Sequence, residues 1–451
     1  MKHKAGFRRV HDWCRSHVRI VLANYKRSRT KALVIGVTGS SAKSTTTLLL
    51  AHILNGASPA RCLPLSNGVY AARKALLALR SKDQYLVVEA GAEKPGDIRK
   101  ISDVLRPDVA IVTLVALEHK SAFHSPEGVM LEKSQLVDAV QPGGFAVLNA
   151  DDALVMQMAE CTSQKVVTFG RSRDAYYRAE AIKGFYPDRL SLRMLWGHTA
   201  LQLSSRFVGE HHWLPMMAAA ATAIELGIAP QMVAERVATF EPVFGRCSIM
   251  SVPNGPIFVV DCVKAPWHSL RLAFEVIEKG KAVRKRIVLG HLSDYLGSNK
   301  KYRDAYDMAR AIADEVIFVG NHSHRSQATV ADRENGRFRE FKSTKHAADY
   351  ISRTAIDGEL ILLKGSKDLH LERIALGFRS NVQCWSQTCG NGADCLRCGL
   401  YERPFEEHRG REPSLRAKVF GHNRSKQWPI DETAGGAKIF DQFEIGSGRR
   451  T

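Results

Sequence analysis

A loop rich in glycine and serine lies near the start of the chain, between an apolar run (residues 33–35) and a helical run (residues 48–54). The loop and its flank read GVTGSSAKSTTT, which places Lys43 and Ser44 just before the helical run. Backbone N–H groups of such a loop and the N-terminus of the next helix attract phosphate oxygens. A lysine there reaches the outer phosphates, and a serine hydroxyl ligates Mg²⁺. We therefore predict a nucleotide site made by Gly39, Ser40, Ser41, Ala42, Lys43, Ser44 and Thr45.

The spacing of this loop departs from the common phosphate-loop pattern, because Val37 stands where the first glycine is expected. The loop fits a shorter form, G-x-x-G-K-[ST], in which Ala42 replaces the second glycine. A glycine at that position lets the backbone approach a phosphate closely or adopt positive φ. The alternative interpretation is an ordinary strand, turn and helix with a polar turn.

Polar side chains stand where later strands are expected to end. Glu89 closes the run YLVVE, His119 follows DVAIVTLVALE, and Lys133 lies in a helical run. A carboxylate and an imidazole beside a phosphate loop are suited to holding Mg²⁺ on a nucleotide. Each could instead be a surface or capping residue, and Asp151 and Asp152 could cap the next helix. The order and spacing of the whole set favour a metal and nucleotide site.

Four cysteines lie close together near the C-terminus, in the pattern C-x4-C-x5-C-x2-C with His408 nearby. Four thiolates can hold zinc in tetrahedral geometry, which stabilises a segment too small to fold by apolar burial. The alternatives are a redox pair and cysteines with no shared role. We predict a zinc knuckle formed by Cys384, Cys389, Cys395 and Cys398.

Strands and helices alternate after the phosphate loop, which is typical of a parallel, doubly wound sheet with its sites at the carboxyl ends of the strands. The expected strands are residues 85–91, 108–117, 145–152 and 166–170. Residues 171–206 are expected to form a small antiparallel insertion, followed by an alanine-rich helix from Met216 to Leu226.

The alternation restarts near residue 241 and predicts a second, Rossmann-like α/β domain of ordinary size. Its expected strands are residues 256–261, 286–290, 315–320 and 360–365. We thus predict an α/β protein with five parts: a basic amphipathic segment (1–31), a P-loop central domain (32–240), a C-terminal domain (241–380), a cysteine-rich appendage (381–408) and a disordered tail (409–451).

The chain is basic, with 65 Lys and Arg against 46 Asp and Glu and a net charge of +19. Residues 1–31 supply +9 of this charge, from ten Lys or Arg against one Asp. The remainder suits anionic substrates such as nucleotides and does not require a nucleic acid partner. Scattered cysteines, no export signal and no apolar run that could span a bilayer predict a soluble, cytoplasmic protein.

The basic segment carries apolar residues at helical spacing, namely Phe7, Val10, Cys14, Val18, Val21 and Tyr25. The favoured interpretation is a helix that packs this stripe onto the next domain. The alternative is an amphipathic helix that contacts an anionic membrane surface or a protein partner.

Over residues 32–378 the chain resembles the Mur ligase family, closest in pattern to the branch that adds D-Ala-D-Ala to the UDP-muramoyl tripeptide. The matching pieces occur in the family's order. They are GSSAKSTTT, NGV, EAGAEKPGDI, RPDVAIVT, EHKSAFHSPEGVMLEKSQLV, GGFAVLNADD, GEHHWLPMMAAAATAIELG, PVFGR, VLGHLSDYLGS and LLKGS.

The resemblance implies an ATP-dependent ligase that phosphorylates a carboxylate and lets an amine attack the acyl phosphate. By the family pattern, Lys43 and Ser44 hold ATP and its Mg²⁺, Glu89 ligates Mg²⁺, and His119 ligates a second Mg²⁺. Lys133 matches a lysine that is carbamylated in many members, where it helps to hold the second metal. The implied catalytic residues are Lys43, His119 and Lys133.

The pattern also implies that the C-terminal domain completes the site, with Arg246 and Asp261 on ATP and His212 near the adenine. Domain closure would then exclude water from the acyl phosphate. The sequence departs from the family at Ala42, at His212 and Pro215 in place of asparagines, and at residues 262–264. The loop begins near residue 36, so we expect no separate N-terminal domain for the UDP-sugar.

These departures leave three interpretations open. The leading one is a Mur-type ligase related to the cell wall. The second keeps the chemistry but uses another metabolite or peptide. The third is a nucleotide-binding protein with impaired catalysis, in which the basic N-terminus and the cysteines serve for docking.

Overall fold

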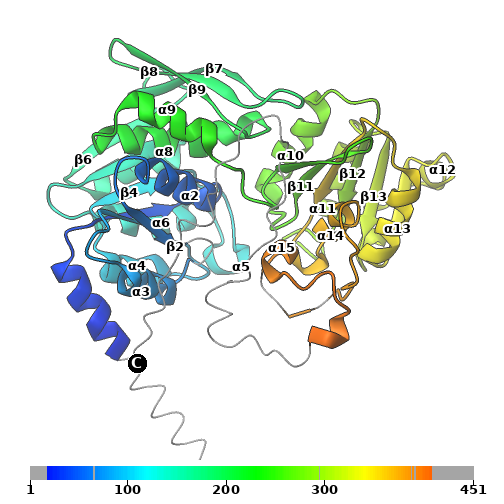
Figure 1. Cartoon of the computed structure of the whole chain (residues 1–451), viewed down its shortest axis with the longest axis horizontal. Helices are drawn as coiled ribbons and strands as arrows, with labels where there is room; N and C mark the ends of the chain where they lie inside the picture. The colour runs from blue at the N-terminus through cyan, green and yellow to red at the C-terminus, as the bar shows by residue number, and fades with distance from the viewer. Residues whose placement is uncertain (1–17, 64–66, 294, 388, 391–392, 409–451) are drawn as a thin grey trace, which may run out of the picture.

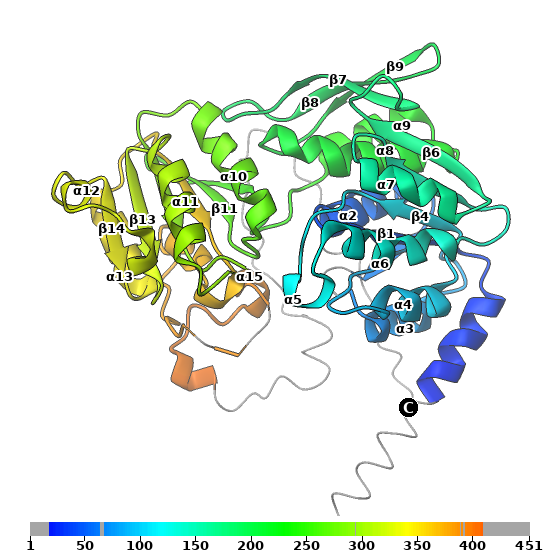
Figure 2. The same ribbon diagram turned by 180° about the vertical axis from the view of Figure 1, so that it is seen from behind.

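The computed structural model describes residues 18–63, 67–293, 295–387, 389–390 and 393–408, which form two α/β domains lying side by side (Figures 1 and 2). The first domain has a nine-stranded sheet in the order β2-β3-β1-β4-β5-β6-β7-β8-β9. Its strands are β1 (Leu33–Thr38), β2 (Ala60–Leu63), β3 (Tyr85–Glu89), β4 (Val109–Val112), β5 (Phe145–Asn149), β6 (Lys165–Gly170), β7 (Tyr177–Lys183), β8 (Ser191–Trp196) and β9 (Thr199–Ser204). The strands expected from the sequence are therefore confirmed.

Neighbouring strands from β2 through β7 run parallel, with β1 paired between β3 and β4. Val37 of β1 lies opposite Glu89 of β3, and Thr38 lies opposite Val112 of β4. Since parallel strands end at the same edge of a sheet, the residues that follow β1, β3 and β4 are brought together there.

Helices cover both faces of this sheet, as a doubly wound fold requires. One apolar core lies under α2 (Lys43–Leu54), α8 (Trp213–Glu225) and α9 (Pro230–Thr239). The other lies under α3 (Val69–Ala78), α4 (Asp97–Leu105), α6 (Pro126–Asp138) and α7 (Ala153–Gln157). The expected alanine-rich helix is α8, and Asp152 caps α7 by accepting hydrogen bonds from the N–H groups of Leu154 and Val155.

The expected antiparallel insertion is confirmed, since β8 pairs antiparallel with both β7 and β9. It is not a separate unit, however, because β7 pairs parallel with β6 and so continues the main sheet.

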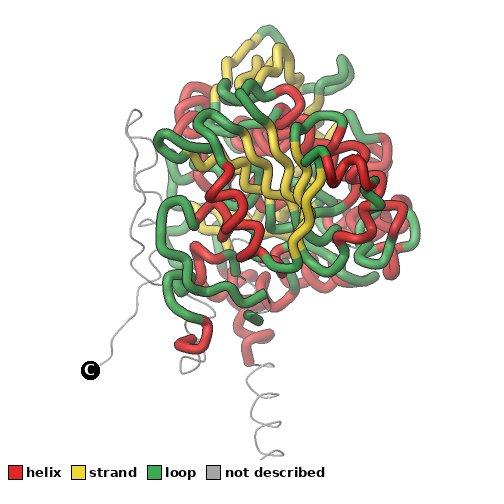
Figure 3. Tube along the Cα trace, turned by 90° about the vertical axis from the view of Figure 1, so that its right-hand side faces the viewer, coloured by secondary structure: helices red, strands yellow, loops and turns green. Residues whose placement is uncertain are grey.

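The second domain has a six-stranded sheet in the order β10-β11-β15-β12-β13-β14. Its strands are β10 (Ser248–Ser251), β11 (Ile257–Asp261), β12 (Lys285–Leu289), β13 (Glu315–Val319), β14 (Phe338–Phe341) and β15 (Leu360–Lys364). β10 pairs antiparallel with β11, and the other neighbouring strands of this sheet in the described part of the chain pair parallel. The helices that flank it are α10 (Trp267–Lys279), α11 (Asn299–Arg310), α12 (Val330–Glu334), α13 (Thr344–Thr354) and α14 (Glu372–Leu376). In Figure 3 its strands lie between helices on both sides.

A backbone hydrogen bond and an apolar contact join the two domains. The N–H of Lys281 donates to the carbonyl of Tyr186 at 2.9 Å, and Val208 of the first domain lies in the apolar core of the second. Residues 240–247 form the covalent connection between the two domains.

A helix at residues 18–29, blue at the lower left of Figure 1, is attached to the first domain mainly by polar contacts. Lys26 donates to two backbone carbonyls at the end of α3. Arg27 donates to two carbonyls at the end of α4 and to the carboxylate of Asp108 at 3.0 Å. Ala23 lies in the apolar core.

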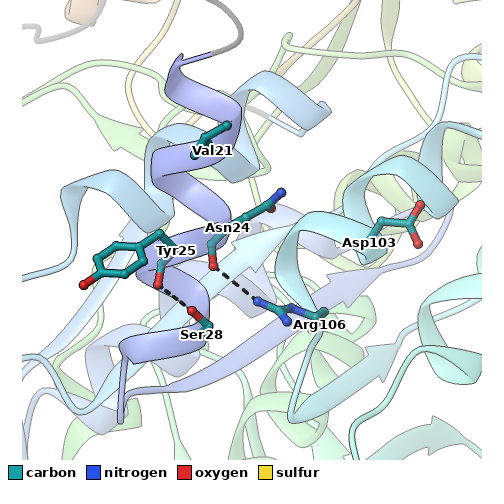
Figure 4. Close-up of a pocket in the computed structure, with 6 residues that line it drawn as sticks. All are labelled: Val21, Asn24, Tyr25, Ser28, Asp103 and Arg106. Carbon is teal, nitrogen blue, oxygen red and sulfur yellow. Dashed lines mark hydrogen bonds between the residues drawn. The ribbon is translucent and has the colours of Figure 1, made fainter.

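The favoured interpretation of the apolar stripe is wrong for the described part of the helix. Val18, Val21 and Tyr25 are 56%, 66% and 60% exposed, so the stripe faces outward. Val21 and Tyr25 line a shallow pocket between this helix and α4, where Arg106 donates to the carbonyl of Asn24 (Figure 4). The other expected stripe residues lie outside the described residues.

The cysteine-rich segment (residues 381–408) folds against the second domain. Val382, Cys395 and Tyr401 form a small apolar cluster with Leu376 of α14. The segment contains α15 (Cys395–Cys398), and the N–H groups of Gln383 and Cys384 both donate to the carbonyl of Tyr401. The tail expected to be disordered (409–451) lies outside the described residues. Among the described helices none is long and apolar enough to cross a membrane.

Candidate active site between the two domains

The phosphate loop joins the end of β1 to the start of α2. Gly39 has φ of +142°, and a Cβ there would lie 1.9 Å from Oγ1 of Thr113, so the position requires glycine. Ala42, at the N-cap of α2, has φ of +65°. This is the left-handed conformation that the missing glycine would adopt without strain, and it costs an alanine about 1 kcal/mol.

Hydrogen bonds from the neighbouring strand ends hold the loop in place. Thr113 Oγ1 donates to the carbonyl of Ser41 at 2.7 Å, and Ser40 Oγ bonds both the carbonyl and the N–H of Ala116. Asn149, at the end of β5, donates to the carbonyl of Thr113 at 2.8 Å. The loop conformation is therefore fixed by the sheet before any ligand binds.

Lys43, Ser44 and Thr45 form the buried first turn of α2. Lys43 Nζ donates to the carbonyl of Gly39 at 2.5 Å, which folds its side chain back over the loop. The Ser44 hydroxyl donates to the carboxylate of Glu89 at 2.7 Å. A hydroxyl beside a buried carboxylate is the hard oxygen donor set that Mg²⁺ prefers, so these residues fit the metal that the family pattern implies.

Lys133 and Glu118 form a buried ion pair beside the loop. Lys133 lies on the face of α6 that is packed against the sheet, is 1% exposed, and donates to Glu118 at 2.7 Å. Burial would raise the pKa of the Glu118 carboxyl, but the ammonium groups of Lys43 and Lys133 lower it to about 2. Burial lowers the pKa of the Lys133 ammonium to about 8, although Glu118 opposes the shift.

The second domain contributes further charges to the same place. Lys264 follows β11, and burial together with Lys43 lowers the pKa of its ammonium, while Glu118 and Glu89 raise it. Burial also lowers the pKa of Arg246, against the carboxylates of Glu89 and Asp261. Lys264 and Arg246 of the second domain thus lie near enough to the phosphate loop for their charges and those of its residues to affect one another.

Asp261 is held at the end of β11 by Lys364 of β15, whose Nζ lies 2.7 Å from its carboxylate. The same Nζ donates to the carbonyl of Lys264 at 2.9 Å. Lys364 therefore fixes both the carboxylate and the backbone from which the Lys264 side chain extends.

His211 and His212 precede α8 and lie at the boundary of the two domains. The His212 ring stacks on Phe207 with centroids 4.6 Å apart, and burial lowers its pKa well below the usual range. Its Nε2 is buried without a hydrogen-bond partner among the described residues. Burial lowers the pKa of His211 to about 4, although Asp261 opposes this. The His212 imidazole is buried and uncharged, and its Nε2 has no hydrogen-bond partner among the described residues. Such a ring suits contact with a flat heterocyclic ligand.

The structure brings most of the predicted site residues together and adds others. Lys43 and Lys133 both affect the pKa of Glu118. Glu89 and Asp261 both affect the pKa of Arg246. His119 follows Glu118 at the N-cap of α5 (Lys120–Phe123) and has φ of +48°.

Sequence reasoning missed Glu118 as the partner of Lys133, and it treated Lys264 as a departure from the family. The signal for Glu118 was its place beside His119, after a strand. Lys264 stands in the segment after Asp261, and only the meeting of the two domains reveals what it faces.

The four predicted zinc ligands do not gather as one group. Cys395 lies with His370 and Glu372, one ligand atom of each within 4.8 Å of the others, and Cys389 lies 3.1 Å from Nε2 of His370. The groups of at least three ligand side chains found among the described residues are this one and His211, His212 and Cys247. The four-cysteine set stays a prediction from the sequence.

Two family models match the chain: the Mur ligase middle domain over residues 37–223, and the Mur ligase glutamate ligase domain over residues 245–367. The UDP-N-acetylmuramoyl-tripeptide–D-alanyl-D-alanine ligase of Mycobacterium bovis is 27% identical over 58% of this chain and 52% of its own length. The chain thus matches about half the length of that relative. The enzyme of the same name from Escherichia coli is 25% identical over 80% of both chains.

A solved structure with a similar fold is the MurF ligase of Thermotoga maritima in complex with ADP. It matches with a TM-score of 0.69 and 20% identity, covering 80% of this chain and 83% of its own. This likeness concerns the fold.

Proposed function

The chain belongs to the Mur ligase family, and on that premise we propose that it is an ATP-dependent ligase that joins a carboxylate to an amine through an acyl phosphate. The observation that carries the proposal is the meeting of two sets of charges. Lys43 and Ser44 of the phosphate loop lie with Glu89 and Glu118 in the first domain, and Lys264 of the second domain interacts with three of these charged groups.

In the proposed reaction, an oxygen of the acceptor carboxylate attacks the γ-phosphorus of ATP, and the bond to ADP breaks. The amine then attacks the acyl carbon, phosphate leaves with the electrons of the C–O bond, and the amine nitrogen loses a proton. Catalysis of phosphoryl transfer of this kind is mainly positioning and charge neutralisation.

The residues of the loop are suited to the first step. The N–H groups of Gly39, Ser40, Ser41 and Ala42 and the start of α2 would surround the phosphates, with Lys43 and Thr45 beside them. Ser44 and Glu89 would hold Mg²⁺, which neutralises phosphate charge when bound. Lys264 would add a second cation from the opposite domain, and Arg246 and Asp261 would contact the nucleotide there. His212 would lie against the adenine.

Lys133 is suited to carbamylation, as the family pattern implies. Carbon dioxide reacts with a neutral amine, and a pKa of about 8 leaves part of the Lys133 amine neutral near physiological pH. The ammonium first loses one proton, and the neutral amine then forms an N–C bond with carbon dioxide and loses a second. A cation is thereby replaced by an anion, with two protons released. The ion pair with Glu118 would then be lost, and two anionic groups beside His119 would hold a second Mg²⁺.

The substrates that we propose follow from the relatives' name: a muramoyl peptide as the carboxylate and a D-alanyl-D-alanine dipeptide as the amine. Other carboxylates and amines would keep the same chemistry.

The proposal is tested with purified protein, ATP and Mg²⁺, a panel of carboxylates, and D-Ala-D-Ala or single amino acids. We expect ADP release that needs both an acid and an amine, with a product whose mass equals their sum less water. Lys43→Ala should abolish turnover. Binding of ATP without turnover across the panel would instead favour a nucleotide-binding protein with impaired catalysis.

The outward-facing apolar stripe of the helix at residues 18–29 supports a second kind of contact, which the small-molecule substrates do not account for. Val18, Val21, Leu22 and Tyr25 are exposed, and Arg19 and Arg29 flank them. Apolar side chains within a basic helix are typical of a segment that lies on an anionic membrane surface. We propose this contact for the N-terminal helix.

A further inference from the structure

A buried group of metal-binding side chains lies apart from the nucleotide loop, where the second domain meets the cysteine-rich segment. It consists of His370, Glu372 and Cys395, and one ligand atom of each lies within 4.8 Å of the other two. None of the three is more than 3% exposed. His370 and Glu372 belong to the second domain at the start of α14, and Cys395 is the first residue of α15.

The atoms of the group converge on one side of the imidazole ring. Nδ1 of His370 lies 3.2 Å from Oε1 of Glu372 and 3.5 Å from Sγ of Cys395. The other ring nitrogen, Nε2, lies 3.1 Å from Sγ of Cys389. A metal ion on Nδ1 would leave the Nε2–H group to donate to Cys389, which is how ligating histidines are usually fixed in one tautomer.

The backbone holds this histidine in an unusual conformation. His370 has φ of +49° at the C-cap of a short 3₁₀ helix, in the left-handed region that costs a residue with a Cβ about 1 kcal/mol. Such strain persists where the surrounding structure enforces it, and it is common at binding sites.

Further hydrogen bonds hold the carboxylate and the thiol of the group in place. Oε1 of Glu372 accepts from the backbone N–H of Cys395 at 3.1 Å. Nε of Arg373 donates to Sγ of Cys395 at 3.1 Å. A divalent metal would stabilise the thiolate directly, since a coordinating thiol loses its proton.

We propose that His370 Nδ1, Glu372 and Cys395 bind a zinc ion that fastens the cysteine-rich segment to the second domain. One nitrogen, one carboxylate oxygen and one thiolate form a ligand set that zinc accepts and that hard cations such as Mg²⁺ do not favour. Binding deprotonates the Cys395 thiol, and the released proton goes to solvent.

This ligand set differs from the four-cysteine knuckle in where its ligands come from. Two of the three ligands belong to the second domain, and Cys384 and Cys398 are not among them. The site also adjoins the strand that carries Asp261, because the Cys262 thiol lies 3.4 Å from Oε2 of Glu372. We assign this zinc a structural role in fastening the segment, and the test below does not depend on the proposed ligase reaction.

The test is the metal content of the full chain, grown with added zinc and freed of loosely bound metal. We expect about one zinc per chain. His370→Gln and Cys395→Ser should each lower it at least tenfold, whereas Cys398→Ser, which removes a half-buried thiol of the same helix, should leave it unchanged. Near-ultraviolet circular dichroism checks that each variant is folded.

Cobalt substitution gives a second readout, which uses only proteins that are expected to bind metal. Cobalt bound to the wild-type chain and to Cys398→Ser should show a thiolate charge-transfer band of the strength of one thiolate. Wild-type protein without zinc would overturn the proposal. Loss of zinc in Cys398→Ser with retention in His370→Gln would also overturn it, in favour of the four-cysteine knuckle.

Discussion

At the scale of single residues, the site is governed by how charges are paired in a buried place. Glu118 lies among the ammonium groups of Lys43, Lys133 and Lys264. They keep its carboxylate ionised although it is buried, with only 9% of the residue exposed. Lys133 depends on this carboxylate, because an unpaired buried ammonium is strongly destabilising. The same burial lowers the Lys133 pKa and so makes its amine available for reaction.

The dependence of activity on Lys133 follows from that pKa. Because the neutral amine is the form that reacts with carbon dioxide, we expect carbamylation, and with it activity, to rise with pH through about 8. Activity measured between about pH 7 and 9, with and without bicarbonate, checks this. Lys133→Ala should be inactive and be partly restored by short-chain carboxylates. Full activity of that variant would exclude a role for the lysine.

Lys264 offers a prediction specific to this chain. If its ammonium neutralises charge during phosphoryl transfer, Lys264→Gln should lower kcat by about 10²–10³-fold, as removal of one such group does elsewhere. The affinity for ATP should change much less. Lys264→Arg should recover part of the rate, since the charge is kept. Lys281→Gln, which alters a lysine of the same domain beyond α10, is the matched control and should retain full activity.

At the scale of elements, the sequence predicts the strands that are buried on both sides and misses those at sheet edges. The missed strands β2, β10 and β14 have four residues each and lie at an edge. An edge strand has one paired neighbour and keeps polar residues on its exposed side, so its apolar signal is weak. The central strands read as continuous apolar runs because helices cover both their faces.

The residue types were enough to locate the phosphate loop in the sequence, but they did not predict its backbone conformation. Ala42 can be identified from the sequence as a replacement for glycine, yet its φ of +65° shows that the loop keeps the glycine-type conformation. The partners of the site residues, such as Glu118 for Lys133, depend on how α6 packs on the sheet. No spacing rule gives that packing.

A single substitution tests the strain in the loop. Ala42→Gly should raise the free energy of unfolding by about 1 kcal/mol, because glycine adopts positive φ without a steric cost. Ala234→Gly, in the middle of α9, should lower it by about the same amount, because a helix disfavours glycine. Denaturant titration measures both. A destabilised Ala42→Gly variant would contradict the strain argument.

The N-terminal helix makes a separate prediction at this scale. We expect the full chain to sediment with vesicles that contain anionic lipid and not with neutral vesicles, because a basic amphipathic helix needs both apolar burial and charge attraction. Val21→Asp should weaken this binding several-fold, whereas Val283→Asp, at an exposed valine of the second domain, should not. Equal binding by Val21→Asp would contradict a membrane role for the helix.

At the scale of the whole molecule, the site exists because two domains meet. The first domain supplies the loop, the carboxylates and Lys133, and the second supplies Arg246, Asp261 and Lys264. The sequence identified the two domains and their order through the restart of the strand and helix alternation and through the family resemblance, and the family models match both. It could not give their mutual placement, which depends on contacts such as that of Val208 with the second core.

The central claim is that the chain activates a carboxylate as an acyl phosphate. The most direct measurement follows a heavy oxygen isotope placed in the carboxylate of the acceptor, with ATP, Mg²⁺ and the amine present. If the carboxylate attacks ATP, one labelled oxygen is transferred to the phosphate that is released, and mass spectrometry of that phosphate detects it. Phosphate released without the label, while the amide forms, would contradict the account.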